Sequence, residues 1–179
     1  ENTNKKQLTK YKKEIDNENV DVHFLVGGTI TNKVLISHIL KPYEAVISPD
    51  NGHINVHETG TIEQSGHKVL TVPNVLGKMQ VSDIEKVIRS HTDEHMVKPK
   101  MVYISNPTEL GTLYSKAELE DVRKACDECG LYLFLDGARL GYGLMSEGYD
   151  VTIEDVARLC DVFYIGGTKQ GALFGEAVV

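Results

Sequence analysis

The stretch Leu131-Tyr132-Leu133-Phe134-Leu135-Asp136-Gly137-Ala138-Arg139 is an apolar run that ends in an acid, a glycine and an arginine. A second stretch has the same plan, because Val162-Phe163-Tyr164-Ile165 leads directly into Gly166-Gly167-Thr168-Lys169-Gln170-Gly171. Short apolar runs bounded by glycine are typical of buried strands. In open α/β sheets, ligands bind beyond the carboxyl ends of the strands. We therefore expect Asp136, Arg139 and Lys169 to share one site, with burial disfavouring the charge of Lys169.

Strand-like and helix-like segments alternate along the rest of the chain. The apolar pattern predicts strands at 22–26, 45–47, 69–72, 101–105, 132–135 and 162–165, and a last strand or hairpin within 173–179. It predicts helices at 29–40, 81–92, 115–129 and 153–159. Residues 1–19 are expected to form an N-terminal helix or arm, and residues 20–179 one domain. This alternation predicts a three-layer αβα fold with a mostly parallel sheet.

Two of the expected helices have sequences that favour a defined start. Ser82 and Glu85 match the spacing of a capping box, as do Ser115 and Glu118. Gly130 stands where a helix commonly ends in a left-handed residue. We therefore expect Ser82 and Ser115 to be N-caps.

Composition and charge restrict the class of protein. The chain has 179 residues, of which 41% are hydrophobic and 25% charged, as expected for one globular domain. Its formal net charge of −7 argues against nucleic acid as a partner. No apolar run approaches membrane-spanning length and nothing resembles a signal peptide, so we expect a cytoplasmic protein that does not contact membranes. Both ends of the sequence look like cuts, which predicts a piece of a longer protein.

The three cysteines fit a reducing compartment. Cys126 and Cys129 have C-x-x-C spacing, but no second ligand pair for zinc accompanies them. Acidic residues lie between the two thiols, which does not favour a redox motif. We expect these cysteines to be structural residues near the end of a helix.

A third run, Gly27-Gly28-Thr29, opens an expected helix, where free backbone N–H groups favour a phosphate. The run matches neither of the glycine motifs that bind nucleoside triphosphates or dinucleotides. The alternative is that the glycines serve only the turn from strand to helix. Pyridoxal 5′-phosphate (PLP) needs a phosphate site, a carboxylate for its ring nitrogen and a lysine for a Schiff base. Gly28, Thr29, Asp136 and Lys169 supply these groups.

The chain resembles the large domain of fold-type-I PLP-dependent enzymes, within the threonine aldolase and β-eliminating lyase family. The matching pieces span residues 20–179: Gly28-Thr29 with Asn32, Gly52-His53-Ile54, Asp136-Gly137-Ala138-Arg139, and Thr168-Lys169. Asn106-Pro107-Thr108 is similar to a run in fold-type-I aminotransferases. The family also has a small C-terminal domain and an N-terminal substrate-contacting segment, and we expect that residues 1–179 do not include either of them.

The resemblance implies a role for each matching residue. Lys169 would form the Schiff base, and Asp136 would pair with the ring nitrogen. Gly28, Thr29 and Thr168 would bind the phosphate, and Asn106 would contact the ring oxygen. His53 would stack on the ring and transfer a proton, and Arg139 would hold the substrate carboxylate. His53 and His57 could also share a helical face as metal ligands, but a third ligand is not evident, so we expect no metal.

The resemblance implies a lyase that cleaves the Cα–Cβ bond of a β-hydroxy amino acid such as threonine, giving glycine and an aldehyde. Such an enzyme is expected to form a homodimer or homotetramer. Two alternatives stay open. One is β-elimination or transamination on the same scaffold, and the other is a catalytically incompetent, dimer-forming fragment.

Overall fold

The computed structural model describes residues 2–179, with side chains described for residue 6 and from residue 8 onward. The strands are β1 (His23–Leu25), β2 (Glu44–Pro49), β3 (Val69–Val72), β4 (Asn74–Val75), β5 (Lys78–Met79), β6 (Lys98–Ser105), β7 (Tyr132–Asp136), β8 (Val162–Gly166) and β9 (Glu176–Val178). The helices are α1 (Asn2–Ile15), α2 (Gly28–Ile39), α3 (His53–Val56), α4 (Thr61–Gln64), α5 (Val81–Ser90), α6 (Lys116–Cys129), α7 (Leu140–Leu144) and α8 (Ile153–Leu159).

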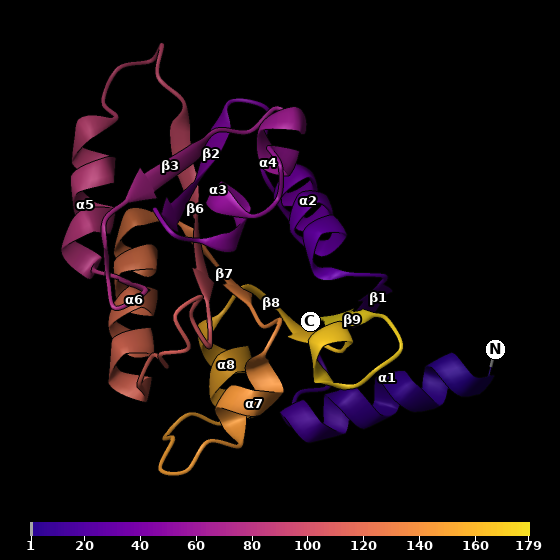
Figure 1. Ribbon diagram of the computed structural model, residues 1–179. Helices are drawn as coiled ribbons and strands as arrows, with labels where there is room; N and C mark the ends of the chain where they lie inside the picture. The colour runs from indigo at the N-terminus through magenta and orange to yellow at the C-terminus, as the bar shows by residue number, and fades with distance from the viewer. Residues whose placement is uncertain (1) are drawn as a thin grey trace.

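The main sheet has the strand order β1-β9-β8-β7-β6-β2-β3 (Figure 1). From β3 to β8 the neighbouring strands are parallel. At the other edge, β9 is antiparallel to both β8 and β1. Two antiparallel pairings restore the direction, so β1 runs the same way as the parallel strands. The segments that follow β1, β7 and β8 therefore meet at one edge of the sheet, as predicted.

Helices cover both faces of this sheet, which confirms the predicted three-layer αβα fold (Figure 1). On one face, α2, α3 and α4 bury Ile36, Ile54 and Ile62 in a common cluster. On the other face, the buried side chains of α5, α6 and α8 join a second, larger cluster. Ile15 of α1 is 2% exposed and belongs to the larger cluster, so the N-terminal helix packs against this domain.

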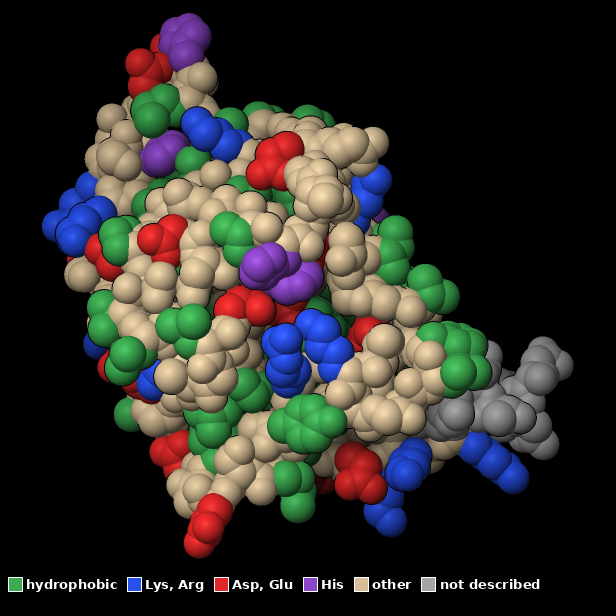
Figure 2. All heavy atoms as spheres, in the orientation of Figure 1, with side chains coloured by type: hydrophobic (Ala, Val, Ile, Leu, Met, Phe, Trp, Pro, Cys, Tyr) green, Lys and Arg blue, Asp and Glu red, His purple; other side chains and the backbone are tan. Residues whose placement is uncertain are grey.

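Acidic, basic and histidine side chains gather near the centre of the face shown in Figure 2. In the same orientation, the central strands of the sheet end in this region (Figure 1). No helix in the described part of the chain is long and apolar enough to cross a membrane.

The predicted caps have different outcomes. Ser115 caps α6 in a complete capping box with Glu118, and Gly130 ends that helix at φ 64°, so both predictions are confirmed. Ser82 is not a cap, because α5 begins at Val81 and its N-cap is Gln80, which makes no side-chain capping bond. The reason lies in the preceding hairpin of β4 and β5, which the apolar pattern does not predict. Because the hairpin ends at Met79, helix α5 already begins at Val81, one residue before Ser82.

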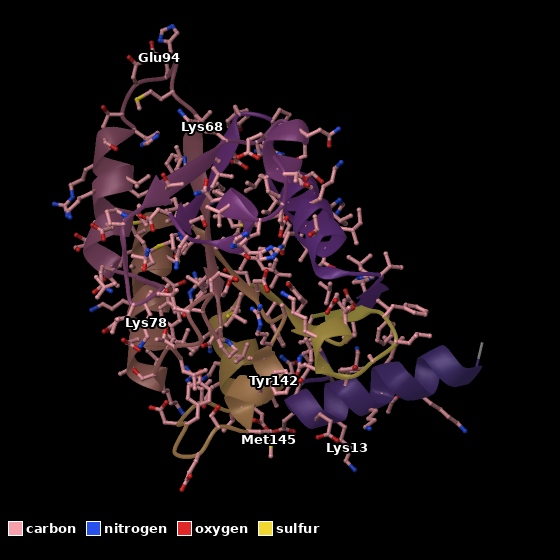
Figure 3. All side chains as sticks on the ribbon, viewed as in Figure 1. Lys13, Lys68, Lys78, Glu94, Tyr142 and Met145 are labelled. Carbon is pink, nitrogen blue, oxygen red and sulfur yellow. The ribbon has the colours of Figure 1, made fainter. Side chains whose placement is uncertain are left out.

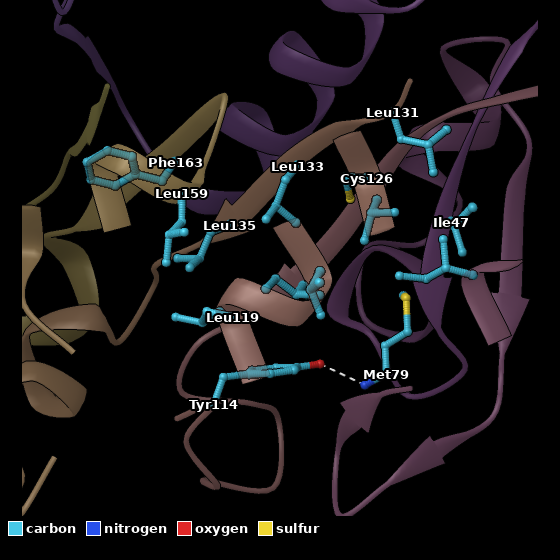
Figure 4. Close-up of a cluster of buried hydrophobic side chains, with 14 of the residues drawn as sticks. Ile47, Met79, Tyr114, Leu119, Cys126, Leu131, Leu133, Leu135, Leu159 and Phe163 are labelled. Atoms are coloured by element: carbon cyan, nitrogen blue, oxygen red, sulfur yellow. Dashed lines mark hydrogen bonds between the residues drawn. The ribbon is translucent and has the colours of Figure 1, made fainter. Parts of the chain in front are cut away.

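Side chains from α6 and the segment before it hold this hairpin in place. Lys78 of β5 is labelled in Figure 3. Its Nζ lies 2.6 Å from Oε2 of Glu118 in α6. The buried hydroxyl of Tyr114 accepts a hydrogen bond from the backbone N–H of Met79, at 2.7 Å (Figure 4). The hairpin is therefore tied to α6 through Glu118 and to the larger hydrophobic cluster through Tyr114.

The C-x-x-C pair is part of that cluster. Cys126 is fully buried, and burial raises the pKa of its thiol to about 12. Burial also raises the pKa of the Cys160 thiol. Thiols held in this state are poor nucleophiles, which supports the structural interpretation of Cys126 and Cys160.

Candidate active site

A cavity of about 330 Å³ opens at the edge of the sheet where β1, β7 and β8 end. It is lined by six residues that the sequence singles out: Gly28, Thr29, His53, Asp136, Thr168 and Lys169. These residues come from four segments that lie far apart in the chain. The fold thus brings together most of the candidate site.

The N-terminus of α2 forms one wall of the cavity. Gly27 is its N-cap and contributes no capping side chain, and the first turn has no acidic residue. The first N–H groups of this 12-residue helix, at Gly28 and Thr29, are therefore available to a ligand. A Cβ on Gly28 would lie 3.2 Å from the hydroxyl of Tyr164, so a larger residue there would crowd the cavity wall. This wall suits an anion such as a phosphate.

Asp136 ends β7, is 3% exposed and accepts hydrogen bonds from four donors. Its Oδ1 accepts from the Tyr164 hydroxyl at 2.5 Å and from the Ala138 N–H at 3.0 Å. Its Oδ2 accepts from the Tyr103 hydroxyl at 2.6 Å and from the Asn32 amide at 3.1 Å. Burial and the nearby carboxylate raise the pKa of both tyrosines well above the ordinary value, which keeps them as donors. The carboxylate is thus fixed at the end of its strand.

His53 begins α3 and contacts a second buried carboxylate, Glu58. The Nδ1 atom of His53 lies 2.7 Å from Oε1 of Glu58, whose side chain has no exposed surface. This hydrogen bond raises the pKa of His53 above its ordinary value of 6.5. Asn32 donates to the same Oε1 atom at 2.6 Å, which joins the histidine and Asp136 in one network.

Lys169 lies in a short 3₁₀ turn, Thr168–Gln170, directly after β8. The expected burial is wrong, because both Thr168 and Lys169 are exposed at the cavity. The reason is the turn itself, which carries the chain out of the sheet after Gly166. The Tyr142 hydroxyl donates to the Lys169 carbonyl at 3.0 Å, so the backbone is held while the amine is free to reach a ligand. None of the described residues forms a salt bridge with its Nζ.

Two predicted site residues lie outside the cavity lining. The guanidinium of Arg139 is at the rim, with its Nη1 atom 3.9 Å from Oε2 of Glu109, which does line the cavity. Asn106 is fully buried, and its amide donates to Tyr149 and accepts from the Tyr114 N–H. Asn106 therefore stabilises the loop after β6, and its contact with the ring oxygen stays a prediction.

Five residues of this site do not stand out in the sequence: Glu58, Tyr103, Glu109, Tyr164 and Glu176. The strand alternation contains a signal for two of them. Tyr103 lies two residues before Ser105, which pairs with Asp136. Val162 pairs with Phe134, so Tyr164 continues the same face of the sheet beside Asp136. Tyrosine at such positions can reach a carboxylate at the end of the strand between them.

The comparisons with known proteins agree with this fold. A sequence model of the family described as beta-eliminating lyase matches residues 1–179. The low specificity L-threonine aldolase of Pseudomonas aeruginosa is 30% identical over 171 residues, covering 94% of this chain and 49% of that protein. Its counterpart in Pseudomonas sp. is 33% identical over 161 residues, covering 89% and 46%. The chain spans about half the length of the curated relatives it matches.

A solved structure of the Leishmania major threonine aldolase superposes with a TM-score of 0.92. The two sequences are 54% identical, and the superposed region covers 93% of this chain and 49% of the Leishmania major chain. The fold and the cavity at the strand ends place the chain among the PLP-dependent transferase-like folds. More particularly, the chain belongs to the beta-eliminating lyase family.

Proposed function

We propose that the protein is a PLP-dependent lyase that cleaves the Cα–Cβ bond of a β-hydroxy amino acid such as threonine, giving glycine and an aldehyde. The observation that carries this proposal is the convergence of Lys169, Asp136, His53 and the α2 N-terminus on one cavity. The threonine aldolases among the relatives support the choice of substrate class. A homodimer or homotetramer stays a prediction.

The residues present fit PLP. The open N-terminus of α2, at Gly28 and Thr29, would hold the phosphate, and Thr168 lines the same cavity. Asp136 is a buried carboxylate fixed for a ring nitrogen, and Lys169 offers a primary amine. The site also contains two buried acceptors, Oδ1 of Asn32 and Oε2 of Glu58, that have no partner within the described residues. Such unsatisfied atoms are expected beside a site that receives a polar ligand.

When bound, PLP supplies an electron sink for the electron pair released at the α-carbon of an amino acid. Lys169 would hold the cofactor through its Nζ and yield this position to the substrate amine. Arg139, at the rim, would bind and orient the substrate carboxylate by paired hydrogen bonds. His53 would accept the proton of the β-hydroxyl at Nε2, because its Nδ1 is engaged by Glu58.

The proposal is tested with the full-length protein, PLP and L-threonine. We expect a visible absorption band from the covalent link to Lys169, which borohydride reduction removes and which is missing in Lys169→Ala. We also expect glycine and acetaldehyde in equal amounts as products. Lys33→Ala, which removes an amine from the outer part of α2, should keep both the band and the activity.

Two results would contradict the proposal. A full-length protein that forms no such band does not use PLP through Lys169. Pyruvate or another oxo-acid as the main product would indicate elimination or transamination instead of aldol cleavage.

A further inference from the structure

Two buried carboxylates lie behind the cavity, and one amide group bridges them. The Nδ2 atom of Asn32 donates to Oε1 of Glu58 at 2.6 Å and to Oδ2 of Asp136 at 3.1 Å. Asn32 is fully buried, the Glu58 side chain has no exposed surface, and Asp136 is 3% exposed. These residues belong to α2, to the turn after α3 and to the end of β7, so the arrangement exists only in the folded chain.

The bridge constrains the orientation of the amide. Asn32 must direct its NH2 group toward both carboxylates, because neither of them can donate when ionised. Its own Oδ1 atom is left without a partner in the described part of the chain. Burial of this amide costs stability unless the bridge compensates for it.

Glu58 concentrates its hydrogen bonds on a single oxygen. Oε1 accepts from both Asn32 and His53, whereas Oε2 has no partner among the described residues. A buried carboxylate needs a compensating charge, and His53 is the ionisable group at hydrogen-bond distance from it. The imidazole must carry its proton on Nδ1 to donate to Glu58. Nε2 is therefore the nitrogen available to exchange a proton with a ligand in the cavity.

Several groups face His53 from the elements packed around it. They are Glu58 and His57 from its own segment, Glu109 after β6 and Asp136 at the end of β7; Tyr164 of β8, Glu176 of β9 and Lys169 in the turn after β8 line the same cavity. The hydrogen bond from Glu58 is the largest influence on the histidine, and it raises the pKa of His53. The charges of Glu58, Glu109 and Asp136 act in the same direction, and partial burial opposes them.

We propose that Glu58 is a positioning residue that fixes the tautomer and the charge of His53, and that Asn32 couples this pair to Asp136. The catalytic role of the Glu58–His53 pair rests on the proposed function, because the proton that Nε2 accepts would come from the β-hydroxyl of the substrate. The geometry itself does not depend on that function. The consequence is that the charge of Glu58 controls the pKa of His53 through the hydrogen bond at Nδ1.

The first test uses the full-length protein and the isosteric variant Glu58→Gln. This substitution keeps an oxygen as acceptor for His53 but removes the negative charge. We expect the pKa of His53, followed by NMR of the imidazole nitrogens, to fall by about one unit or more. Glu63→Gln is the matched control, because Glu63 is exposed in the neighbouring helix α4 and its loss should leave His53 unchanged.

A second readout separates positioning from a merely structural role. In Glu58→Gln we expect the kcat for threonine to fall about tenfold or more with KM within about twofold, and the acidic limb of the pH profile to move with the pKa of His53. An unchanged pKa of His53 in Glu58→Gln would overturn the proposal even if the variant were less stable.

The wild-type protein provides a second test, which does not depend on whether Glu58→Gln folds. At a pH where His53 is neutral, its nitrogen chemical shifts should identify the tautomer with the proton on Nδ1. A proton on Nε2 would overturn the proposal. This measurement also distinguishes the two proposals, because a protein that binds no PLP would contradict the proposed function and leave the His53 tautomer as it is.

Discussion

Asp136 shows how one side chain can be fixed before any ligand arrives. Four donors reach its two oxygens, and three of them belong to side chains of α2, β6 and β8. An ionised carboxylate offers about four lone-pair directions, so these donors occupy all of them. Tyr164 also lines the cavity. A ring nitrogen that binds Asp136 would therefore share or replace the hydrogen bond of the Tyr164 hydroxyl.

His53 gives the molecule a stability that depends on pH. Because its folded pKa is raised above the ordinary 6.5, its contribution is fully present below about pH 6.5 and is lost as the pH rises through the folded pKa. We expect the free energy of unfolding of the wild type to exceed that of Glu58→Gln by more at about pH 6 than at about pH 9. Urea titrations at the two pH values measure both differences.

The exposed variant Glu63→Gln serves again as the control. Its difference from the wild type should be small and equal at the two pH values, because Glu63 does not contact His53. A gap between wild type and Glu58→Gln that widens toward high pH would contradict the sign of the His53 shift.

The sequence is informative about residues that break a local pattern. Lys169 and Asp136 are conspicuous because a charge directly follows an apolar strand, and the strand ends bring them together. Glu58 follows a short polar segment like many surface acids, and nothing local indicates that its side chain has no exposed surface. Tyr103 and Tyr164 look like ordinary core residues, because strand alternation indicates their contact with Asp136 only once the sheet register is known.

At the scale of elements, α5 and α6 offer a matched pair of predicted caps with different outcomes. The hydroxyl of Ser115 accepts from the Glu118 N–H, so Ser115→Ala should reduce the free energy of unfolding by about 1 kcal/mol. Ser82 lies inside the first turn of α5 and is exposed, so Ser82→Ala should change stability by less than about 0.5 kcal/mol. Urea unfolding of both variants checks the difference. An equal loss in the two variants would contradict the assigned helix starts.

Elements with strong periodicity were predictable, whereas elements set by tertiary contacts were not. The parallel strands and α6 follow directly from apolar spacing and a capping box. The hairpin of β4 and β5 has only two residues in each strand, and it depends on Tyr114 and Glu118 from elsewhere in the chain. The sequence predicts a strand or hairpin at β9, but the residues of β9 do not indicate its place between β8 and β1.

At the scale of the whole molecule, the sheet organises both stability and the site. Its two faces bury separate hydrophobic clusters, and its edge collects the polar residues that the core excludes. The cavity is also lined by residues from β9 and from the segments next to β1 and β9. These are Val26, directly after β1, Phe174, shortly before β9, and Glu176, the first residue of β9. A change in sheet register would therefore disturb the core and the cavity together.

The acidic residues around the cavity also affect how fast an anion can enter it. Glu109, Asp136 and Glu176 line the cavity of a chain with a formal charge of −7, so an approaching phosphate meets repulsion before it reaches α2. Raising the ionic strength from about 0.01 M to about 0.15 M shortens the screening length from about 30 Å to about 8 Å. Stopped-flow absorbance should then show faster association of PLP, with a smaller gain for pyridoxal, which lacks the phosphate. Association that slows with salt would mean that the α2 N-terminus and Lys169 dominate the approach.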